Sequence, residues 1–369
     1  ESRKEETVMQ IQEKMKALVL PNPGVFEIRD VDVPRPGPFE VLCRIGAVAI
    51  CGSDPEIIHG GQAGYWPPYY PFIPGHEWAG EVVALGENVQ GFHVGDRVAG
   101  EAWKGCGHCA ECKAGRYNLC RNYACPETGM RHYGFQNQGA YAQYNAYSIK
   151  SIHTMPSHVS FHEGSLVDTA GVSLHGIELT GLTAGGTVAV IGPGPIGLTA
   201  MRLAKAMGAS RVIAVGRRAR LQAAGRLGAD ELVDIEKQDP VEAVRSLTDN
   251  NGADEVFEAS GAEGTLRQAI RMVKPGGRIG LLGVPNEKVM EKIPFKYVCR
   301  NEIVIMGVKA NPNVGGKIVS MIASGKLNVR DLITHTFPLE RFAEALDTFE
   351  NRRDGAVKVI VEPNGEHSQ

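Results

Sequence analysis

Residues 187–197 read TVAVIGPGPIG, a short apolar run followed by three glycines in the spacing G-x-G-x-x-G. In a strand–turn–helix unit, the first glycine turns the chain and the second lets backbone amides approach a pyrophosphate, while the third lets the helix pack close to the strand. Phosphate oxygens then lie at the positive N-terminus of the helix. The stretch therefore predicts a dinucleotide-binding turn. The residues expected at this turn are Gly192, Gly194, Pro195, Ile196 and Gly197.

The residues that follow this turn alternate between strand-like and helix-like patterns. The apolar runs RVIAVG, ELVDI, DEVFEAS, RIGLLGV and EIVIMGV are separated by helical segments, including ones around Val241–Thr248 and Gly264–Val273. Alternation of this length predicts an α/β domain with a doubly wound parallel sheet. The glycine triplet alone also occurs in ordinary turns, but a strand before it, a helix after it and a second such unit favour the dinucleotide site.

The second strand-like run ends at the position that usually binds the adenosine ribose through a carboxylate. Gly216, Arg217 and Arg218 stand there instead. An absent acid removes repulsion toward a 2′-phosphate and makes room for it, and guanidinium groups match phosphate oxygens. The alternative is that the two arginines are a solvated helix start, although cations oppose the dipole at that end. We expect NADP(H) to be favoured over NAD(H).

The rest of the chain predicts a second domain. Residues 15–165 are rich in glycine, proline and short runs such as EVLCRIGAVAI, which is typical of a mostly antiparallel β domain with long loops. Residues 311–369 are too few for a separate domain and are expected to complete the first one. We therefore expect a polar extension at 1–14, a catalytic domain at 15–174 with 311–369, and a dinucleotide-binding domain at 175–310.

Composition excludes several classes of function. The 369 residues are 43% apolar and 22% charged, with a formal net charge of −3, as in soluble globular proteins. The absence of a basic stripe argues against nucleic acid as a partner. No apolar run is long enough for a bilayer span, and the start ESRKEETVMQIQEK has no apolar core of a secretory signal. We expect a cytoplasmic protein without a membrane partner.

Four of the eight cysteines cluster in the segment GCGHCAECKAGRYNLC. Their spacing, C-x2-C-x2-C-x7-C, predicts a closed tetrahedral Zn²⁺ shell that stabilises a lobe at about 100–125 and has no open coordination position. The alternative is a set of reduced thiols in a flexible lobe. The expected ligands of this structural zinc are Cys106, Cys109, Cys112 and Cys120.

A dispersed set of metal-binding residue types gains its meaning from a family resemblance. From Met15 to about Pro363 the chain resembles the zinc-dependent medium-chain dehydrogenase/reductase family. The segment GHEWAGEVVALGENV matches that family's zinc signature, G-H-E-x-x-G-x-x-x-x-x-G-x-x-V, and the cysteine lobe and glycine turn follow in the family's order. The resemblance implies a GroES-like β domain plus a Rossmann domain, with the active site in the cleft between them.

The resemblance also implies a catalytic zinc site. Its ligands correspond to Cys51 and His76, with Glu77 a carboxylate that binds the metal in some members. The third ligand varies among branches, and Asp168 corresponds to the aspartate of some bacterial NADP-dependent secondary-alcohol members, which also carry a glycine and arginine cluster. Those members lack an intact four-cysteine lobe, so this chain is similar to an intermediate branch.

Residues near Cys51 correspond to the family's proton-transfer machinery. Ser53 matches the hydroxyl that accepts the alcohol proton, and Asp54 matches a carboxylate that orients the liganding histidine. The usual relay histidine is replaced by Glu56, so the proton leaves through Glu56, through His59 or through water.

The stretch GYWPPYYPF and Trp103 are candidates either for a substrate wall or for packing, and Tyr133 and Phe135 are weaker candidates.

The function implied is hydride transfer between NADP(H) and a small secondary alcohol or ketone, with two zinc ions per chain. A polyol, sugar or amino-alcohol dehydrogenase of the sorbitol or threonine type is the main alternative. A zinc-free quinone or enoyl reductase of the same superfamily and a non-catalytic binding protein are further alternatives, against which the complete ligand set argues. The resemblance also implies a homo-oligomer, a tetramer or a dimer.

Overall fold

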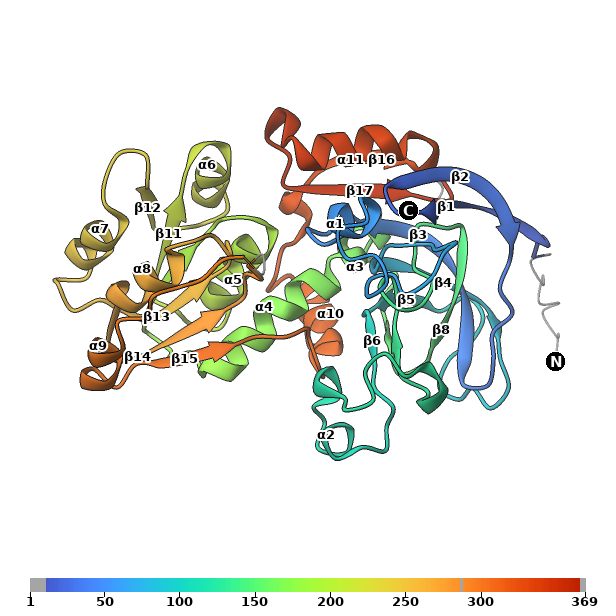
Figure 1. Ribbon diagram of the computed structural model, residues 1–369, viewed down its shortest axis with the longest axis horizontal. Coiled ribbons are helices and arrows are strands. Elements are labelled where there is room, and N and C mark those ends of the chain that lie inside the picture. The colour runs from blue at the N-terminus through green and yellow to red at the C-terminus, as the bar shows by residue number, and fades with distance from the viewer. Residues whose placement is uncertain (1–10, 286–287, 366–369) are drawn as a thin grey trace.

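The computed structural model describes residues 11–285 and 288–365, which form two domains side by side (Figure 1). Most of the expected polar extension at 1–14 therefore lies outside the described residues. Within the described part of the chain, no helix combines the length and apolar character that crossing a membrane requires.

The dinucleotide-binding domain is built on a six-stranded parallel sheet in the order β12-β11-β10-β13-β14-β15. The chain enters this sheet at the central strand β10, adds β11 and β12 on one side, and then returns to add β13, β14 and β15 on the other side. In such doubly wound sheets, ligands bind where the direction of strand addition reverses, here between β10 and β13. The predicted Rossmann sheet is confirmed. Its strands are β10 (Thr187–Ile191), β11 (Arg211–Gly216), β12 (Glu231–Asp234), β13 (Ala253–Glu258), β14 (Val273–Leu281) and β15 (Val304–Gly307).

The central strand β10 is apolar on both faces because helices cover both faces of the sheet. Val188 and Val190 pack with Leu198 in one core, whereas Ala189 and Ile191 belong to a core on the opposite face. The predicted helices around 241–248 and 264–273 are present, each within one residue of the expected limits. The connecting helices are α5 (Pro195–Ala206), α6 (Arg218–Arg226), α7 (Pro240–Leu247), α8 (Thr265–Met272) and α9 (Phe295–Arg300).

The other domain is built on a seven-stranded sheet in the order β16-β17-β3-β4-β5-β9, with β8 also paired to β3. All its pairings are antiparallel except that of β16 with β17. The chain's last strand, β17, pairs with β3, so the C-terminal segment joins this sheet. The strands are β3 (Glu40–Ala49), β4 (Glu77–Leu85), β5 (Arg97–Gly100), β8 (Tyr144–Ser148), β9 (Ile152–Thr154), β16 (Ile333–Pro338) and β17 (Lys358–Glu362).

Shorter elements surround this sheet. The hairpin of β1 and β2 lies at its edge, and α2 lies in the lobe that projects from the domain (Figure 1). These elements are β1 (Lys14–Asn22), β2 (Val25–Asp32), α1 (Asp54–Ile58), β6 (Trp103–Lys104), α2 (Ala110–Lys113), β7 (Arg131–His132), α3 (Phe161–Ser165) and α11 (Phe342–Glu350). Single 3-10 turns cover η1 (Tyr117–Leu119), η2 (Pro126–Thr128), η3 (Arg330–Leu332), η4 (Leu339–Arg341) and η5 (Arg353–Gly355).

Two helices join the domains. The helix α4 (Val167–Thr180) packs against α5 and β14 of the dinucleotide-binding domain and against β4 and β5 of the other domain. It also contacts α10 (Gly315–Ala323), which packs on β9. The expected domain boundary at residue 174 lies inside α4, so one continuous helix carries Asp168 and links the two domains.

Candidate metal and cofactor site

Strand pairing brings three of the predicted metal ligands together. Register between β3 and β4 pairs Ala49 with Glu77, so the residues just beyond β3 and just before β4 lie side by side. As a result, ligand atoms of Cys51, His76 and Glu77 all lie within 4.8 Å of one another. A thiolate, an imidazole and a carboxylate at such separation are a donor set that Zn²⁺ accepts.

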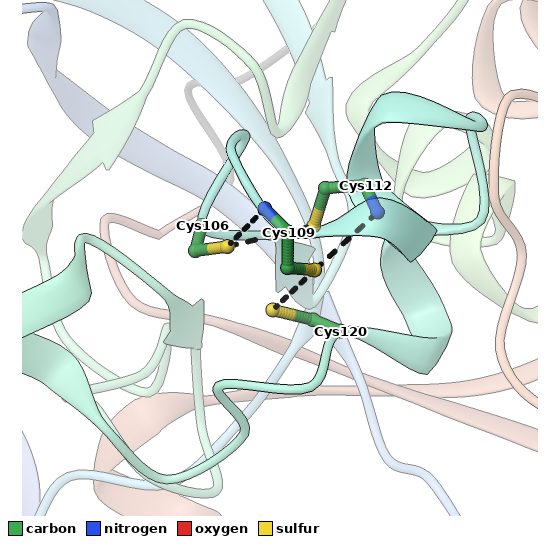
Figure 2. A group of neighbouring side chains, drawn as sticks. All are labelled: Cys106, Cys109, Cys112 and Cys120. Atoms are coloured by element: carbon green, nitrogen blue, oxygen red, sulfur yellow. Dashed lines mark hydrogen bonds between the residues drawn. The ribbon is translucent and has the colours of Figure 1, made fainter.

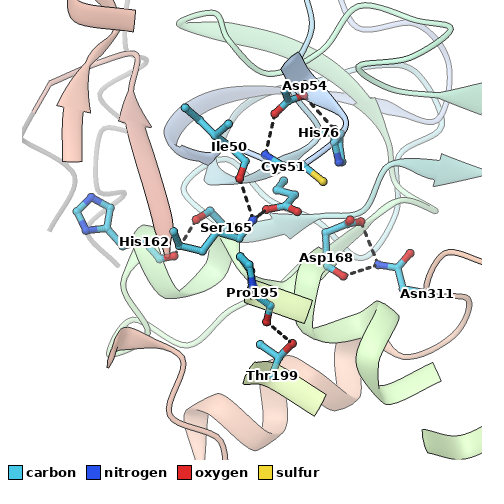
Figure 3. Close-up of polar contacts among 12 residues, drawn as sticks. Ile50, Cys51, Asp54, His76, His162, Ser165, Asp168, Pro195, Thr199 and Asn311 are labelled. Atoms are coloured by element: carbon cyan, nitrogen blue, oxygen red, sulfur yellow. Dashed lines mark hydrogen bonds and ion pairs between the residues drawn. The ribbon is translucent and has the colours of Figure 1, made fainter. Parts of the chain in front are cut away.

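Asp54 positions two of these residues (Figure 3). Its fully buried carboxylate accepts hydrogen bonds through Oδ2 from the Cys51 N–H at 2.9 Å and from the Tyr141 hydroxyl at 2.7 Å. Its Oδ1 lies 3.6 Å from Nδ1 of His76. Asp54 thus faces one ring nitrogen and leaves the other for a metal, the arrangement that orients liganding histidines. Tyr141 is a positioning residue that the sequence did not reveal.

The surroundings of His76 favour positive charge. Burial alone would lower the pKa of His76, but the Cys51 sulfur and the Asp54 carboxylate outweigh burial and raise that pKa well above its usual value. A divalent cation competes with the proton for the same electronegative surroundings. The residues present therefore fit a metal ion.

Glu77 also has an ion-pair partner that the sequence did not reveal. The ammonium of Lys358, on β17, forms an ion pair with the Glu77 carboxylate, and it also donates a hydrogen bond to the Ile50 carbonyl at 3.1 Å. Both side chains are only 2% exposed. A lone lysine inside the apolar run AVKVIVEP was the available signal, because a buried ammonium requires a partner.

Asp168 faces the same region from α4 but lies outside the group of three (Figure 3). Its Oδ1 accepts hydrogen bonds from the Ala102 N–H at 3.2 Å and from the Asn311 side-chain amide at 3.0 Å. Burial raises the pKa of Asp168 to about 6, with Glu77 adding to the shift and His76 opposing it. Its role as a third ligand stays a prediction, and Asn311 is a partner that the sequence did not reveal.

The predicted proton-transfer residues are not connected to one another. The Ser53 hydroxyl oxygen is buried and has no hydrogen-bond partner among the described residues, so it is available to a ligand. Glu56 is exposed on α1, and His59 at the end of this helix contacts Glu350 at 2.7 Å between Nε2 and Oε1. The exit route for the proton therefore stays a prediction.

An aromatic wall adjoins His76. The centroid of the Phe135 ring lies 4.6 Å from that of the His76 ring, and the His132 ring stacks on Phe135 with their centroids 4.0 Å apart. Trp66, from GYWPPYYPF, lies 4.9 Å from Phe135, and Trp103 stacks on His132 at 4.1 Å. Burial lowers the pKa of His132 well below its usual value, so His132 is uncharged at neutral pH. The Lys309 ammonium lies over the Trp103 ring, 4.9 Å from its centroid.

Tyr133 is not part of the wall. Its hydroxyl accepts a hydrogen bond from the Ser148 N–H at 3.0 Å, and its ring packs on Tyr147. Of the two weaker aromatic candidates, Phe135 lies beside the predicted ligand His76 and Tyr133 packs in the domain core.

The four clustered cysteines converge as their spacing predicts (Figure 2). The sulfurs of Cys106 and Cys112 lie 3.9 Å apart, and those of Cys109 and Cys120 lie 4.0 Å apart. Tetrahedral geometry with Zn–S bonds of about 2.3 Å requires sulfurs separated by about 3.8 Å. The four sulfurs therefore fit a zinc ion whose coordination shell they would complete.

Local hydrogen bonds lower the pKa of Cys106 and Cys109, whereas burial raises the pKa of Cys112 and Cys120. Burial opposes ionisation of Cys106, but the backbone N–H groups of His108 and Cys109 outweigh burial, and the pKa of Cys106 falls to about 6. Thiolates are the metal-binding form of cysteine. A side chain at Gly105 would place its Cβ 2.5 Å from the sulfur of Cys112, so only glycine fits this turn.

The glycine turn has the predicted packing. Gly192 adopts a left-handed φ of 89°, and a Cβ at this residue would lie 2.7 Å from the side chain of Ser260. A Cβ at Gly197 would lie 2.2 Å from the Gly192 carbonyl oxygen, so α5 packs close to β10. Gly194 precedes α5 directly, which places the first N–H groups of the helix beside the turn.

Gly216 and the two arginines after it make contacts within the chain that the sequence did not reveal. A Cβ at Gly216 would lie 2.5 Å from the Pro193 ring, so close packing against this ring requires a glycine here. Arg218 donates a hydrogen bond to Glu236 at 2.9 Å, and Arg217 lies 3.8 Å from the same carboxylate oxygen. Both arginines are exposed and share Glu236 as a partner, so their role toward the cofactor stays a prediction.

Comparisons with known proteins agree with this geometry. Residues 37–157 match the alcohol dehydrogenase GroES-like domain, and residues 195–321 match the family described as zinc-binding dehydrogenase. Sorbitol dehydrogenase of Bacillus subtilis (strain 168) is 35% identical over 356 residues, which cover 96% of this chain and 99% of that protein. L-threonine 3-dehydrogenase of Bacillus licheniformis is 33% identical over 357 residues, which cover 94% and 99%.

A solved structure shows the same fold. A protein of Sinorhizobium meliloti 1021, solved bound to NADP, matches with a TM-score of 0.87 at 33% identity, covering 95% of this chain and 100% of that chain.

Proposed function

The chain belongs to the zinc-dependent medium-chain dehydrogenase/reductase family, and we propose that it transfers hydride between NADP(H) and small secondary alcohols or ketones. The observation that carries the proposal is the convergence of Cys51, His76 and Glu77 within 4.8 Å, beside an unpartnered Ser53 hydroxyl. The preference for NADP(H) rests on the absent acid at Gly216 and the surplus of arginines that follows it.

In this proposal Cys51, His76 and Asp168 hold the catalytic zinc, with Glu77 as an exchangeable fourth carboxylate. Bound zinc supplies Lewis acidity that polarises the substrate oxygen, and the nicotinamide carries the hydride. Ser53 would accept the alcohol proton at Oγ and release its own hydroxyl proton to Glu56, His59 or water, and Asp54 holds His76 in a single orientation. Trp66, Phe135 and the uncharged His132 exclude water from one side of the site.

The four cysteines of the lobe hold a second zinc ion that supports the fold and takes no part in the chemistry. We also propose a homo-oligomer, a dimer or a tetramer. This follows the family resemblance, and Val284, Met290 and Phe295 of the dinucleotide-binding domain, which are 88%, 81% and 75% exposed, are apolar side chains that such an interface would cover.

A second candidate is a polyol or amino-alcohol dehydrogenase. It is favoured by the similarity to proteins named sorbitol dehydrogenase and L-threonine 3-dehydrogenase over nearly the whole chain. The intact four-cysteine lobe of this chain also favours the second candidate, because the secondary-alcohol members that the chain resembles lack such a lobe.

The two candidates are separated by one assay series. The zinc-loaded protein is assayed with 2-butanol, sorbitol, 2,3-butanediol and L-threonine, each with NADP⁺ and with NAD⁺. The proposal expects the highest kcat/KM for 2-butanol with NADP⁺. Turnover of sorbitol or L-threonine but not of 2-butanol would establish the second candidate, and no turnover by fully zinc-loaded protein would contradict both.

A further inference from the structure

A short segment, residues 309–313, lies between β15 and α10, where the chain returns from the dinucleotide-binding domain. Asn311, in the middle of this segment, is only 1% exposed, and its side-chain amide donates to Oδ1 of Asp168 at 3.0 Å (Figure 3). A Cβ built at Gly171 would lie 2.8 Å from the Cβ of Asn311, so Asn311 packs directly against α4, one turn beyond Asp168. Any displacement of the segment would therefore displace a hydrogen-bond donor of Asp168.

The cysteine lobe fixes both ends of this segment. At one end, the buried side-chain amide of Asn118 donates to the Lys309 carbonyl at 2.7 Å. At the other end, the Asn313 N–H donates to the Tyr117 hydroxyl at 2.9 Å, and the Asn313 side-chain amide donates to the Gly115 carbonyl at 2.8 Å. Asn311 thus lies between two points at which residues of the lobe hold the backbone.

Tyr117 also connects the lobe to the second donor of Asp168. Its hydroxyl donates to Oε1 of the fully buried Glu101 at 2.7 Å. Burial and the charge of Glu101 raise the pKa of Tyr117, so the hydroxyl keeps the proton that this bond requires. The residue after Glu101 is Ala102, whose N–H donates to Oδ1 of Asp168 at 3.2 Å. The lobe therefore contacts the chain next to both donors of Asp168.

These contacts leave one oxygen of Asp168 to a metal. Both donors reach Oδ1, and no residue within 11–285 or 288–365 donates a hydrogen bond to Oδ2. Hydrogen bonds to a liganding carboxylate fix its orientation and so contribute to the affinity for the metal. The Asp168 carboxylate is arranged in this way before a metal binds.

We propose that Tyr117 and Asn118 are positioning residues for the catalytic site: by fixing the segment that carries Asn311, they hold Asp168 in place for the catalytic metal. The inference rests on the proposed function, in which Asp168 is a zinc ligand. The zinc ion of the lobe acts here only by keeping Tyr117 and Asn118 in place, so it still supports the fold and takes no part in the chemistry.

The test measures metal affinity without turnover. Zinc-loaded protein is titrated with a chromophoric chelator, which gives a Kd for each of the two zinc sites, and Cys51→Ala identifies the Kd of the catalytic site. Asn311→Ala is expected to raise that Kd about tenfold to a hundredfold, as loss of a partner of a liganding side chain does. Asn118→Ala and Tyr117→Phe lie farther from the metal and are expected to raise it about threefold or more.

A double-mutant cycle separates positioning from general loosening of the fold. Asp168→Ala alone is expected to raise the Kd of the catalytic site. Added to Asp168→Ala, Asn118→Ala is expected to change this Kd no further, because the carboxylate that it positions is gone. An additive effect of the two changes, or an unchanged Kd in Asp168→Ala, would overturn the inference.

Arg116→Ala is the matched control in the lobe. Its side chain pairs with Glu111 at 2.7 Å, inside the lobe, and has no printed contact with the segment 309–313. This variant is expected to leave the Kd of the catalytic site within about twofold of wild type. An equal loss in Arg116→Ala and Asn118→Ala, or unchanged affinity in both Asn118→Ala and Tyr117→Phe, would overturn the inference.

Failure of this inference is distinguishable from failure of the proposed function. An enzyme that prefers NAD⁺ or rejects secondary alcohols would contradict the proposed function, yet a non-additive loss of zinc affinity in the cycle would still support the positioning role. Conversely, efficient turnover of 2-butanol with NADP⁺ and unchanged zinc affinity in Asn118→Ala and Tyr117→Phe would sustain the function and overturn the inference.

Discussion

Lys358 and Glu77 form an ion pair that is almost completely buried next to the candidate catalytic metal site. They lie 281 residues apart in the sequence and meet because β17 pairs with β3, which in turn pairs with β4. Lys358 therefore holds the carboxylate of Glu77 beside Cys51 and His76 while offsetting its charge.

Removal of this lysine is expected to destabilise the fold. Lys358→Met leaves a buried carboxylate without its partner, which costs about 3–5 kcal/mol, whereas Glu77→Gln combined with Lys358→Met restores most of the stability. Urea unfolding of zinc-loaded protein measures both. Lys317→Met, which breaks an exposed pair with Glu178, is the control and is expected to cost at most about 1 kcal/mol. Equal stability of Lys358→Met and wild type would show that the buried pair has no energetic role.

The arginines after Gly216 provide a test of cofactor preference. Changing Arg217 and Arg218 to alanine together is expected to raise the KM for NADP⁺ by about tenfold or more and to leave the KM for NAD⁺ nearly unchanged. Glu236→Gln is expected to lower the KM for NADP⁺, because both arginines lose a competing carboxylate. Steady-state kinetics with each cofactor measures these changes, and equal changes for both cofactors would assign the arginines to a solvated surface.

The cysteine lobe is expected to support the fold rather than the reaction. Cys112→Ser opens a closed shell, so it should remove one zinc ion per chain and lower the melting temperature before it affects chemistry. Cys125→Ser, a nearby cysteine outside the group, is the matched control. Metal analysis and calorimetry measure the outcome, and a stable Cys112→Ser protein that lacks only catalysis would refute the structural role.

The start of α3 predicts a pH-dependent contribution to stability. Ser160 and Glu163 form a capping box, in which the Ser160 hydroxyl donates to Glu163 at 2.6 Å, and Arg330 adds a contact at 3.2 Å. Burial opposes the charge, but these donors lower the pKa of Glu163 below its usual 4.5. The carboxylate therefore stabilises the fold fully above pH 4.5, and this contribution disappears as pH falls through the lower pKa of the folded state.

Glu163→Gln is accordingly expected to cost about 1 kcal/mol at pH 7 and progressively less below pH 4.5. Urea unfolding of wild type and variant at each pH gives the difference, in which effects common to both proteins cancel. A difference that grows as the pH falls would mean that the fold raises the pKa of Glu163, contrary to this account.

The features that the sequence predicted depend on short-range patterns. The spacing of Gly192, Gly194 and Gly197 and the alternation of apolar runs are local signals, and they predicted the order of strands and helices in the Rossmann domain. The four cysteines lie within one segment, so their spacing alone predicted that they converge.

The features that the sequence did not predict are contacts between distant residues. Tyr141 reaches Asp54 across 87 positions, and Asn311 reaches Asp168 across 143, and neither has a local pattern that signals it. Gly216 shows a different limit, because a glycine is equally consistent with room for a ligand and with close packing. Here the Pro193 ring packs closely on Gly216, which a motif cannot reveal.

In the proposed function Cys51 and His76 hold a metal on which turnover depends, and the most direct test of this is the zinc content and turnover of Cys51→Ala, determined on the same sample. We expect this variant to fold, to lose one of two zinc ions per chain and to lose alcohol oxidation. A folded variant that retains both zinc ions, or that still oxidises the alcohol, would contradict it.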